Sequence, residues 1–310
     1  MAKQDPVPSM EWEITTACNY QCSYCCQKSY VSKHGQHGSD ETVQAVFALL
    51  KTLPGSWQIK LIGGEPFLHP RFFEMCDTIT RLNHRVCTTT NFSLPLEKYA
   101  AFVEIAGERL AYLTASLHLE QVKSLDEFVE KAIRFQRLKP EAADFSVTSV
   151  CMEEHLETLQ NIAARFDREG VRFSLQHLKE EGKYSTYHNP QAAEFLNSRL
   201  LKNVETLRSG HFFGTNCLTG KLFFRVTQNG DVKRCYNIQP MFYLGNVADG
   251  TFRPFETALP CMSPRCTCTL PANNGMIRYG ERAALPTLIR AYSLGWLRNI
   301  RHMLARKFAR

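Results

Sequence analysis

The sequence predicts an α/β fold, an incomplete (β/α)6 barrel followed by a small cysteine-rich domain. Two observations carry this prediction. Six short β-rich runs alternate with longer stretches of helical periodicity, which is typical of a parallel sheet wrapped by helices. Cysteines gather after the first run and again near the carboxyl end. The 310 residues, 44% hydrophobic and 22% charged, suffice for one large and one small domain and exclude disorder and low complexity.

Six βα units are fewer than the eight of a closed TIM barrel, so we expect a TIM-like but incomplete barrel with its site at the carboxyl ends of the strands. The expected strands are Met10–Thr15, Gln58–Ile62, Arg85–Thr89, Leu110–Leu117, Phe145–Cys151 and Val171–His177. The expected helices are Asp40–Leu53, Pro70–Leu82, Pro95–Ala106, Ser124–Leu138 and Glu153–Glu169.

The composition changes after the sixth strand. One more helical pattern runs to about Arg208, and the dipeptide Asn229-Gly230 then predicts the tight turn of a hairpin over Lys221–Tyr236. We therefore divide the chain into a partial barrel (1–185), a linker helix (186–215), a cysteine-rich domain (216–275) and a basic amphipathic carboxyl-terminal helix (276–310).

Three cysteines follow the first strand directly, with CxxxCxxC spacing: Cys18, Cys22 and Cys25. A structural zinc site closes its shell with four protein ligands, whereas three thiols without a partnering histidine indicate an iron–sulfur cluster with one open iron. A zinc site that takes Cys26 as its fourth ligand is the alternative.

The second strand ends in the turn Gly63-Gly64-Glu65-Pro66, where two glycines let a ligand approach the backbone and a carboxylate can receive an ammonium group. Together with CxxxCxxC, this turn resembles the radical S-adenosylmethionine (SAM) enzyme superfamily. The resemblance implies that SAM binds the open iron of a [4Fe-4S] cluster. It also implies reductive cleavage of SAM to a 5′-deoxyadenosyl radical, which abstracts a hydrogen atom from a substrate carbon.

The resemblance extends from about Met10 to Leu178 and adds three residues to the implied SAM site. Tyr24 stands where the family places an aromatic ring against adenine, and Ser116 matches a fourth-strand serine that contacts SAM. Asn91 matches a TNG-like turn, except that Phe92 replaces the glycine, which leaves the geometry of this loop open.

Other polar residues near the strand ends are weaker candidates. We expect His118 and His177 to contact a polar substrate or to be ordinary loop or core histidines. Glu180, Glu181, Lys183 and Tyr184 are candidates to line the mouth of the barrel, and His34 and His37 are interpreted as solvated linker.

The carboxyl-terminal cysteines begin with Cx12Gx4C, from Cys217 through Gly230 to Cys235, which resembles a SPASM or twitch auxiliary domain. In the family a full SPASM domain uses more cysteines for two clusters than the five found here, so the resemblance implies one auxiliary [4Fe-4S] cluster of the twitch type. The run from Cys261 to Cys268 replaces the usual CxxC pair, which leaves the ligand set open, and we interpret Cys217, Cys235, Cys266 and Cys268 as the ligands. Cys261 is then spare, and we interpret it as a hydrogen-atom donor. Cys76, Cys87 and Cys151 lie in strand or helical patterns and are expected to be small buried hydrophobes.

A thiol that returns a hydrogen atom to the substrate radical would allow epimerisation, and the resemblance of this arrangement to radical SAM epimerases implies a sugar or aminocyclitol carbon, in a small molecule or glycan. Without a donor, the substrate radical would lose an electron to the auxiliary cluster, as in a dehydrogenase that oxidises an alcohol to a ketone. A peptide-modifying (RiPP) enzyme is a further alternative, and a zinc- or cluster-bearing interaction or electron-transfer protein is the non-enzyme alternative. The resemblance implies a reducing partner such as flavodoxin or ferredoxin.

The net charge of +7 resides entirely in residues 278–310, which disfavours a nucleic-acid-binding body. Without a signal core or a long apolar run, we expect a cytoplasmic protein. The tail predicts an amphipathic helix that packs on the barrel, docks an acidic partner, or contacts the inner membrane surface peripherally. Its apolar residues recur with helical spacing at Leu285, Leu288, Ile289, Tyr292, Trp296, Ile300, Met303, Leu304 and Phe308.

Overall fold

The computed structural model describes residues 5–180, 183–200, 211–236, 243–263, 266, 269–289, 293, 297 and 300. The chain forms two compact units, and both are discontinuous in sequence. Unit 1 comprises Met1–Glu13, Gly38–Ile59 and Lys202–Arg310, and unit 2 comprises Ile14–His37 and Lys60–Leu201. The first strand and first helix thus group largely with the carboxyl-terminal part of the chain, which differs from the contiguous domains that the sequence suggested.

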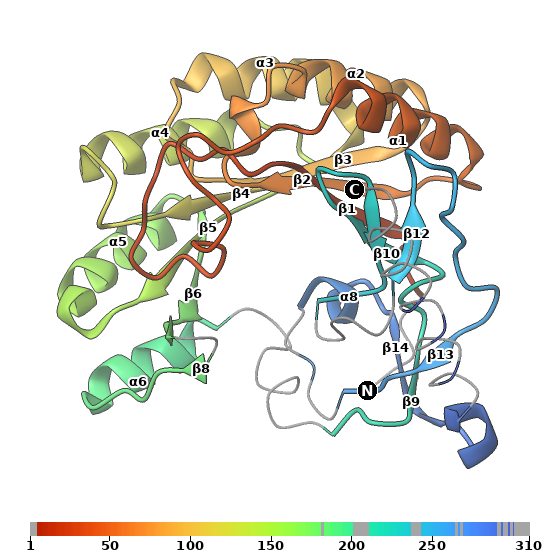
Figure 1. The fold of residues 1–310 in the computed structure, drawn as a ribbon. Helices are drawn as coiled ribbons and strands as arrows, with labels where there is room; N and C mark the ends of the chain where they lie inside the picture. The colour runs from red at the N-terminus through yellow and green to blue at the C-terminus, as the bar shows by residue number, and fades with distance from the viewer. Residues whose placement is uncertain are drawn as a thin grey trace. The chain divides into compact units, whose positions relative to one another are not determined.

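Unit 2 is an α/β layer built on parallel strands. Its strands follow one another in the order β2 (Gln58–Gly63), β3 (Arg85–Thr90), β4 (Leu110–Leu117), β5 (Asp144–Cys151) and β6 (Arg172–His177). The ladders from β3 to β6 are all parallel. One face of the strands is covered by α2 (Phe72–Arg81), α3 (Leu96–Ala106), α4 (Leu125–Leu138) and α5 (Leu156–Arg168) (Figure 1).

Short elements complete unit 2. They are the 3-10 turns η1 (Pro66–Leu68), η2 (Gly107–Arg109) and η3 (Glu153–His155), the hairpin β7 (Lys179–Glu180) and β8 (Lys183–Tyr184), and α6 (Pro190–Ser198).

The described residues of unit 1 contribute four strands to one sheet and three to another. In the first, β1 (Ser9–Thr15) pairs in parallel with β10 (Phe223–Val226), and β11 (Asp231–Lys233) joins β10 to β12 (Tyr243–Asn246) in antiparallel fashion. The second has β9 (Thr215–Cys217) between β13 (Leu259–Pro260) and β14 (Ile277–Arg282). Its helices include α1 (Asp40–Thr52) and α8 (Thr269–Asn273).

The predicted strands and helices of the first 177 residues are confirmed, with ends that differ by a few residues. The predicted hairpin is confirmed too: Gly230 adopts a φ of +80°, and its N–H donates to the Thr227 carbonyl at 2.9 Å. Positive φ is the conformation that glycine adopts without a steric cost.

The prediction of a helix from residue 276 onward is wrong for Ile277–Arg282, which form β14. Ile277 lies opposite Cys217 in the sheet and is 8% exposed. The helical spacing in the sequence begins only at Leu285, so the predicted helix begins too early, at residues that pair with β9 instead. Helical residues begin at Leu285. The side chains of Leu285 and Ile289 are 68% and 59% exposed. Most of the remaining tail, from Arg290 onward, lies outside the described residues.

Within the part of the chain that the structure describes, no helix combines the length and the apolar character that a bilayer crossing requires.

An aromatic core joins the helices of unit 2 to its strands. The ring centroids of Phe67 and Phe72 lie 4.1 Å apart, and those of Phe92 and Tyr99 lie 4.2 Å apart. Phe135 lies edge-on to Phe92 and is fully buried. Because aromatic side chains bury the largest apolar area, this cluster contributes strongly to the stability of unit 2.

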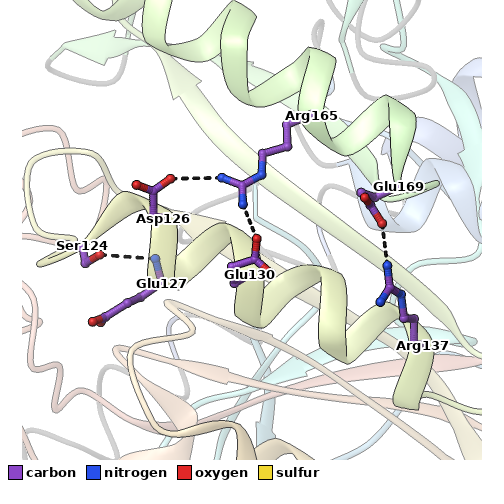
Figure 2. Close-up of polar contacts among 7 residues, drawn as sticks. All are labelled: Ser124, Asp126, Glu127, Glu130, Arg137, Arg165 and Glu169. Carbon is purple, nitrogen blue, oxygen red and sulfur yellow. Dashed lines mark hydrogen bonds and ion pairs between the residues drawn. The ribbon is translucent and has the colours of Figure 1, made fainter.

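The outer surface of α4 and α5 carries ion pairs (Figure 2). Arg165 of α5 pairs with Asp126 and Glu130 of α4, and Arg137 pairs with Glu169 at 2.6 Å. At the start of α4, Ser124 caps the helix by accepting a hydrogen bond from the Glu127 N–H at 3.3 Å. These charged side chains are largely solvated, so each pair contributes little.

Two neighbouring residues of α5 should therefore differ greatly in their effect on stability. Arg165→Ala should lower the free energy of unfolding by less than about 1 kcal/mol, because both of its acidic partners, Asp126 and Glu130, are exposed to solvent. Phe166→Ala should lower it by about 3–5 kcal/mol, because this ring is 0% exposed. Urea unfolding followed by circular dichroism gives both values, and equal losses would contradict this account of the packing.

Candidate functional site

The loop after β1 carries Cys18, Cys22 and Cys25, and backbone hydrogen bonds close it on itself. The Cys18 N–H donates to the Ser32 carbonyl at 2.9 Å, and the Thr16 N–H donates to Gln36 at 2.8 Å. We call residues 16–37 the cluster loop. Its three motif cysteines therefore project from a closed and ordered segment.

His37 helps to close the cluster loop. Its Nδ1 lies 2.8 Å from the Thr15 hydroxyl, and its ring meets His69 edge-on with centroids 5.1 Å apart. His34 and His37 are both exposed, as the interpretation as solvated linker expects, and His37 in addition fixes the end of the loop through its contacts with Thr15 and His69.

The three motif thiols lie close enough to influence one another. The pKa of Cys22 is raised to about 12, chiefly by burial, and the neighbouring thiols of Cys25 and Cys18 contribute to the same rise. Burial also raises the pKa of Cys18 and of Cys25. Thiols ligate metals as thiolates, so a positive iron centre is the kind of partner that this site needs. Cys26, beside them in sequence, is exposed.

The glycines of the turn after β2 permit a close backbone approach by the cluster loop. A Cβ on Gly63 would lie 2.1 Å from the Thr15 carbonyl oxygen, and one on Gly64 would lie 2.3 Å from the Ala17 oxygen. Hydrogen bonds exploit this closeness, since the Gly64 and Glu65 N–H groups donate to Thr15 and Ala17 at 2.9 and 2.8 Å. The sequence predicts that a ligand approaches the backbone at these glycines. In the structure it is the cluster loop that packs against them.

Glu65 is fully buried and binds protein groups through both of its carboxylate oxygens. Oε1 accepts hydrogen bonds from the Thr90 hydroxyl at 2.7 Å and the Phe67 N–H at 3.2 Å, and Oε2 accepts from the Asn91 N–H at 2.6 Å. Burial raises the pKa of Glu65 to about 7, although these bonds oppose the shift. Glu65 thus connects the end of β2 to the end of β3. The sequence predicts an ammonium group as the partner of its carboxylate and does not reveal these protein partners.

Asn91 joins that strand end to the cluster loop. Its Nδ2 donates to the Asn19 Oδ1 at 2.7 Å and lies 3.9 Å from the Cys18 sulfur. Asn91 thus lies beside the first motif cysteine.

Phe92, which replaces the glycine of the TNG-like turn, adopts the backbone conformation that a glycine would have. It adopts a φ of +55°, the left-handed conformation that glycine would supply. Its buried ring stacks on Tyr99, and the Lys131 ammonium lies 4.9 Å from the ring centroid. Aromatic packing offsets the cost of about 1–2 kcal/mol that a left-handed non-glycine residue incurs.

Tyr24 pairs with His118, which follows β4. The two rings stack with centroids 5.9 Å apart, and the Tyr24 hydroxyl lies 3.2 Å from His118 Nδ1. Burial lowers the pKa of His118 to about 4, so its imidazole is neutral at pH 7. His118 therefore orients Tyr24 as an uncharged partner.

Sequence reasoning missed two residues beyond His118 that hold the cluster loop. The Glu120 carboxylate accepts from the Ser23 N–H at 2.9 Å and the Ser23 hydroxyl at 2.5 Å. The Gln121 side chain accepts from the Gln21 N–H at 3.3 Å and donates to its carbonyl at 3.4 Å. Their position directly after a strand end is the signal that was available.

The remaining barrel candidates lie near their expected strand ends. Ser116 is half-buried and lies opposite Thr148 of β5. The His177 ring meets Tyr184 and Tyr187 with centroids 5.3 and 5.8 Å away. Glu180 and Lys183 are backbone partners in the β7–β8 hairpin, and Glu181 lies outside the described residues.

Four cysteines of unit 1 line one pocket: Cys217, Cys235, Cys261 and Cys266. Leu259 and Ile277 flank Cys217 in the three-stranded sheet, and the Cys261 N–H donates to Thr215 at 2.7 Å. Burial raises the pKa of Cys261 to about 11, with Cys217 and Cys235 adding to the rise. The proposed donor Cys261 thus shares a pocket with three proposed ligands, while Cys268 lies outside the described residues.

The prediction for the three isolated cysteines is confirmed, since Cys76, Cys87 and Cys151 are all 0% exposed. Across the described segments, no three His, Cys, Asp or Glu side chains converge on a point where one metal ion would be ligated. A [4Fe-4S] cluster asks for a different arrangement, with each thiolate on its own iron atom.

Comparison with known proteins identifies the class to which this site belongs. Residues 12–135 match the model of the Radical SAM superfamily, a stretch that contains CxxxCxxC and the Gly63–Pro66 turn. The chain therefore carries a radical SAM domain, with SAM and a [4Fe-4S] cluster as cofactors. The three motif thiols, which lie close enough to influence one another's pKa, fit the cluster.

Curated relatives match over different lengths. A probable GTP 3′,8-cyclase of Methanothermobacter thermautotrophicus is 30% identical over 133 residues, which are 38% of this chain and 43% of that protein. The mycofactocin maturase MftC of Mycobacterium ulcerans is 26% identical over 280 residues, 78% of this chain and 72% of that one. The match thus spans under half the length of the cyclase and most of the maturase.

Solved structures share the fold. The AdoMet-bound structure of anSMEcpe has a TM-score of 0.56 at 20% identity, covering 79% of each chain. SuiB of Streptococcus suis bound to S-adenosylmethionine has a TM-score of 0.56 at 12% identity, covering 79% of this chain and 64% of that one. At these identities the likeness establishes the fold alone.

Substitution of Gly64 should separate close approach from backbone strain. Gly64→Ala should lower the free energy of unfolding by at least about 2 kcal/mol and reduce the iron bound at the cluster loop, because its Cβ meets the Ala17 carbonyl. Gly170→Ala is the matched control: its φ of +67° costs about 1 kcal/mol, but nothing lies within 4 Å. Equal iron contents and stabilities in both variants would contradict this account.

Glu65 should make stability depend on pH in the cluster-free protein. Its folded pKa, about 7, lies above the unfolded value of 4.5, so its contribution is fully present below pH 4.5 and is lost as pH rises through 7. Relative to Glu65→Gln, the wild-type free energy of unfolding should fall by about 3 kcal/mol over this range. Urea unfolding at several pH values measures the difference, and parallel pH curves for the two proteins would argue against it.

Proposed function

We propose that this protein is a radical SAM enzyme that modifies a peptide substrate. The observation that carries the proposal is the match to the maturase MftC, because it spans 78% of this chain and so extends well beyond the radical SAM domain. Two solved structures of the same fold have peptides bound, anSMEcpe with the Cp18Cys peptide and SuiB with the precursor peptide SuiA. Both support a peptide substrate for this architecture.

In the proposed site, Cys18, Cys22 and Cys25 hold the SAM-binding cluster. When bound, the cluster and SAM supply the reductive cleavage and the hydrogen abstraction. Gly63 and Gly64 hold the cluster loop against β2, and Glu65 and Asn91 fix the neighbouring strand end. Tyr24, oriented by His118, and Ser116 are the proposed contacts to SAM. A protein reductant such as flavodoxin or ferredoxin delivers the electron.

An auxiliary [4Fe-4S] cluster in residues 216–275 is the second part of the proposal. We assign its ligands to Cys217, Cys235, Cys261 and Cys266, because all four line one pocket. This assignment makes Cys261 a ligand in place of a free hydrogen-atom donor, and it is drawn from the described residues, which do not include Cys268. The prediction of epimerisation at a sugar carbon depended on a free thiol donor, so this assignment disfavours it. A role of the auxiliary cluster as electron acceptor is favoured instead.

The test measures 5′-deoxyadenosine formed by the reconstituted protein with dithionite and SAM. Peptides encoded by short reading frames beside its gene should raise the yield at least about tenfold and leave a changed peptide mass, because correct substrates complete such sites. Cys22→Ala should abolish the product, whereas Cys26→Ala, at the exposed neighbouring thiol, should retain it. Stimulation by an aminocyclitol or sugar, with none by any peptide, would overturn the proposed substrate class.

A further inference from the structure

A fully buried guanidinium lies beside the four thiols of the unit 1 pocket. Arg234 precedes Cys235 in the chain, lines the same pocket and is 1% exposed. We propose that Arg234 is a positioning residue for the auxiliary cluster, which holds three cysteine-bearing segments in register and raises the reduction potential of the cluster. This inference rests on the auxiliary cluster proposed above.

The hydrogen bonds of Arg234 reach two segments besides its own. Its Nε donates to the Thr219 carbonyl at 2.9 Å and the Thr219 hydroxyl at 3.1 Å. Its Nη1 donates to the Pro260 carbonyl at 3.1 Å, and its Nη2 donates to the Leu259 carbonyl at 2.6 Å. Because Thr219 lies two residues after Cys217, and Pro260 directly precedes Cys261, one rigid fork fixes the neighbours of three thiols.

Thr219 extends this connection to the sulfur itself. Its hydroxyl donates a hydrogen bond to the Cys217 sulfur at 3.3 Å and accepts one from Arg234. Hydrogen bonds to cluster sulfurs are among the factors that set the potential of an iron–sulfur centre. The guanidinium therefore acts on Cys217 through Thr219 as well as through its own charge.

The surrounding packing forms a slot for the arginine. Gly220 has a φ of +89°, and a Cβ there would lie 2.4 Å from the Phe255 ring and 3.2 Å from the Arg234 Cγ. The Phe255 N–H donates to the Gly220 carbonyl at 2.8 Å, and the guanidinium lies 5.7 Å from the Phe255 ring centroid. Burial of a charged guanidinium costs free energy unless hydrogen bonds compensate for the lost water. The packing and the four hydrogen bonds of Arg234 provide that compensation, which makes the position specific for arginine.

The charge has a definite consequence for redox chemistry. An arginine stays protonated in proteins, so its positive charge is fixed. Reduction of a thiolate-ligated cluster adds negative charge, and a nearby buried cation stabilises the reduced form. Loss of the charge at position 234 should therefore lower the reduction potential.

The experiment uses the full chain with Cys18, Cys22 and Cys25 all changed to Ala, so that only the auxiliary cluster remains. Arg234→Gln removes the charge, and Arg234→Lys keeps the charge but loses the fork. Arg253→Gln is the matched control, because Arg253 is exposed and also donates to backbone carbonyls, those of Gly250 at 2.8 Å and Phe252 at 2.7 Å. Iron retention against a chelator and EPR-monitored redox titration are measured for each.

We expect Arg234→Gln to weaken iron retention about 10–100-fold, as the loss of partners around metal ligands commonly does. Its redox equilibrium should shift at least about tenfold toward the oxidised cluster, which is about 59 mV for one electron. Arg234→Lys should lose iron similarly but keep a potential near that of the parent, and Arg253→Gln should match the parent in both. If Arg234→Gln fails to fold, Thr219→Val tests the same connection, since it removes the hydrogen bond to Cys217, and it should also lower the potential.

The outcomes separate the two proposals. A parent protein that binds no iron after anaerobic reconstitution would overturn the auxiliary cluster itself. A parent that binds about four irons, with unchanged retention and potential in Arg234→Gln, would overturn only the role of Arg234.

Discussion

The contact between the cluster loop and the turn after β2 is the constraint on which the radical SAM site depends. At Gly63 and Gly64 the two backbones approach to distances that leave no room for a Cβ. Hydrogen bonds from Gly64 and Glu65 to Thr15 and Ala17 fix the register of that approach. The three thiols can then project from a loop whose base is held by main-chain atoms, which vary less in position than side chains do.

Hydrogen-bonded side chains at the ends of neighbouring strands also hold the cluster loop in place. Glu65 receives three hydrogen bonds, two of them from Thr90 and Asn91 at the end of β3, and Asn91 reaches the cluster loop through Asn19. On the other side, Glu120 and Gln121 follow β4 and bind the loop between Gln21 and Ser23. Carboxyl ends of neighbouring parallel strands meet at one edge, so residues distant in sequence combine into one support.

The two cysteine sites use the same principle with different elements. In unit 2 a loop is held by close main-chain packing, and in unit 1 the sheet register places Leu259 and Ile277 on either side of Cys217. The buried Arg234 then connects its own segment, which precedes Cys235, to the paired segments that carry Cys217 and Cys261. A cluster with four thiolates on separate irons needs such long-range positioning, because its ligands are spread over the corners of a cube.

The sequence by itself determined the class of fold, the strands of the partial barrel and the motif that identifies the radical SAM domain, because periodicity and short motifs are local properties. Only the tertiary structure decided what Gly63, Glu65 and His37 contact, since their partners lie on other strands or across the loop. It also showed that Ile277–Arg282 form a strand, because these residues pair with β9, a partner about sixty residues earlier in the chain that local spacing does not reveal. The grouping of Cys261 with the other pocket cysteines likewise depends on strand pairing, which spacing in the chain does not encode.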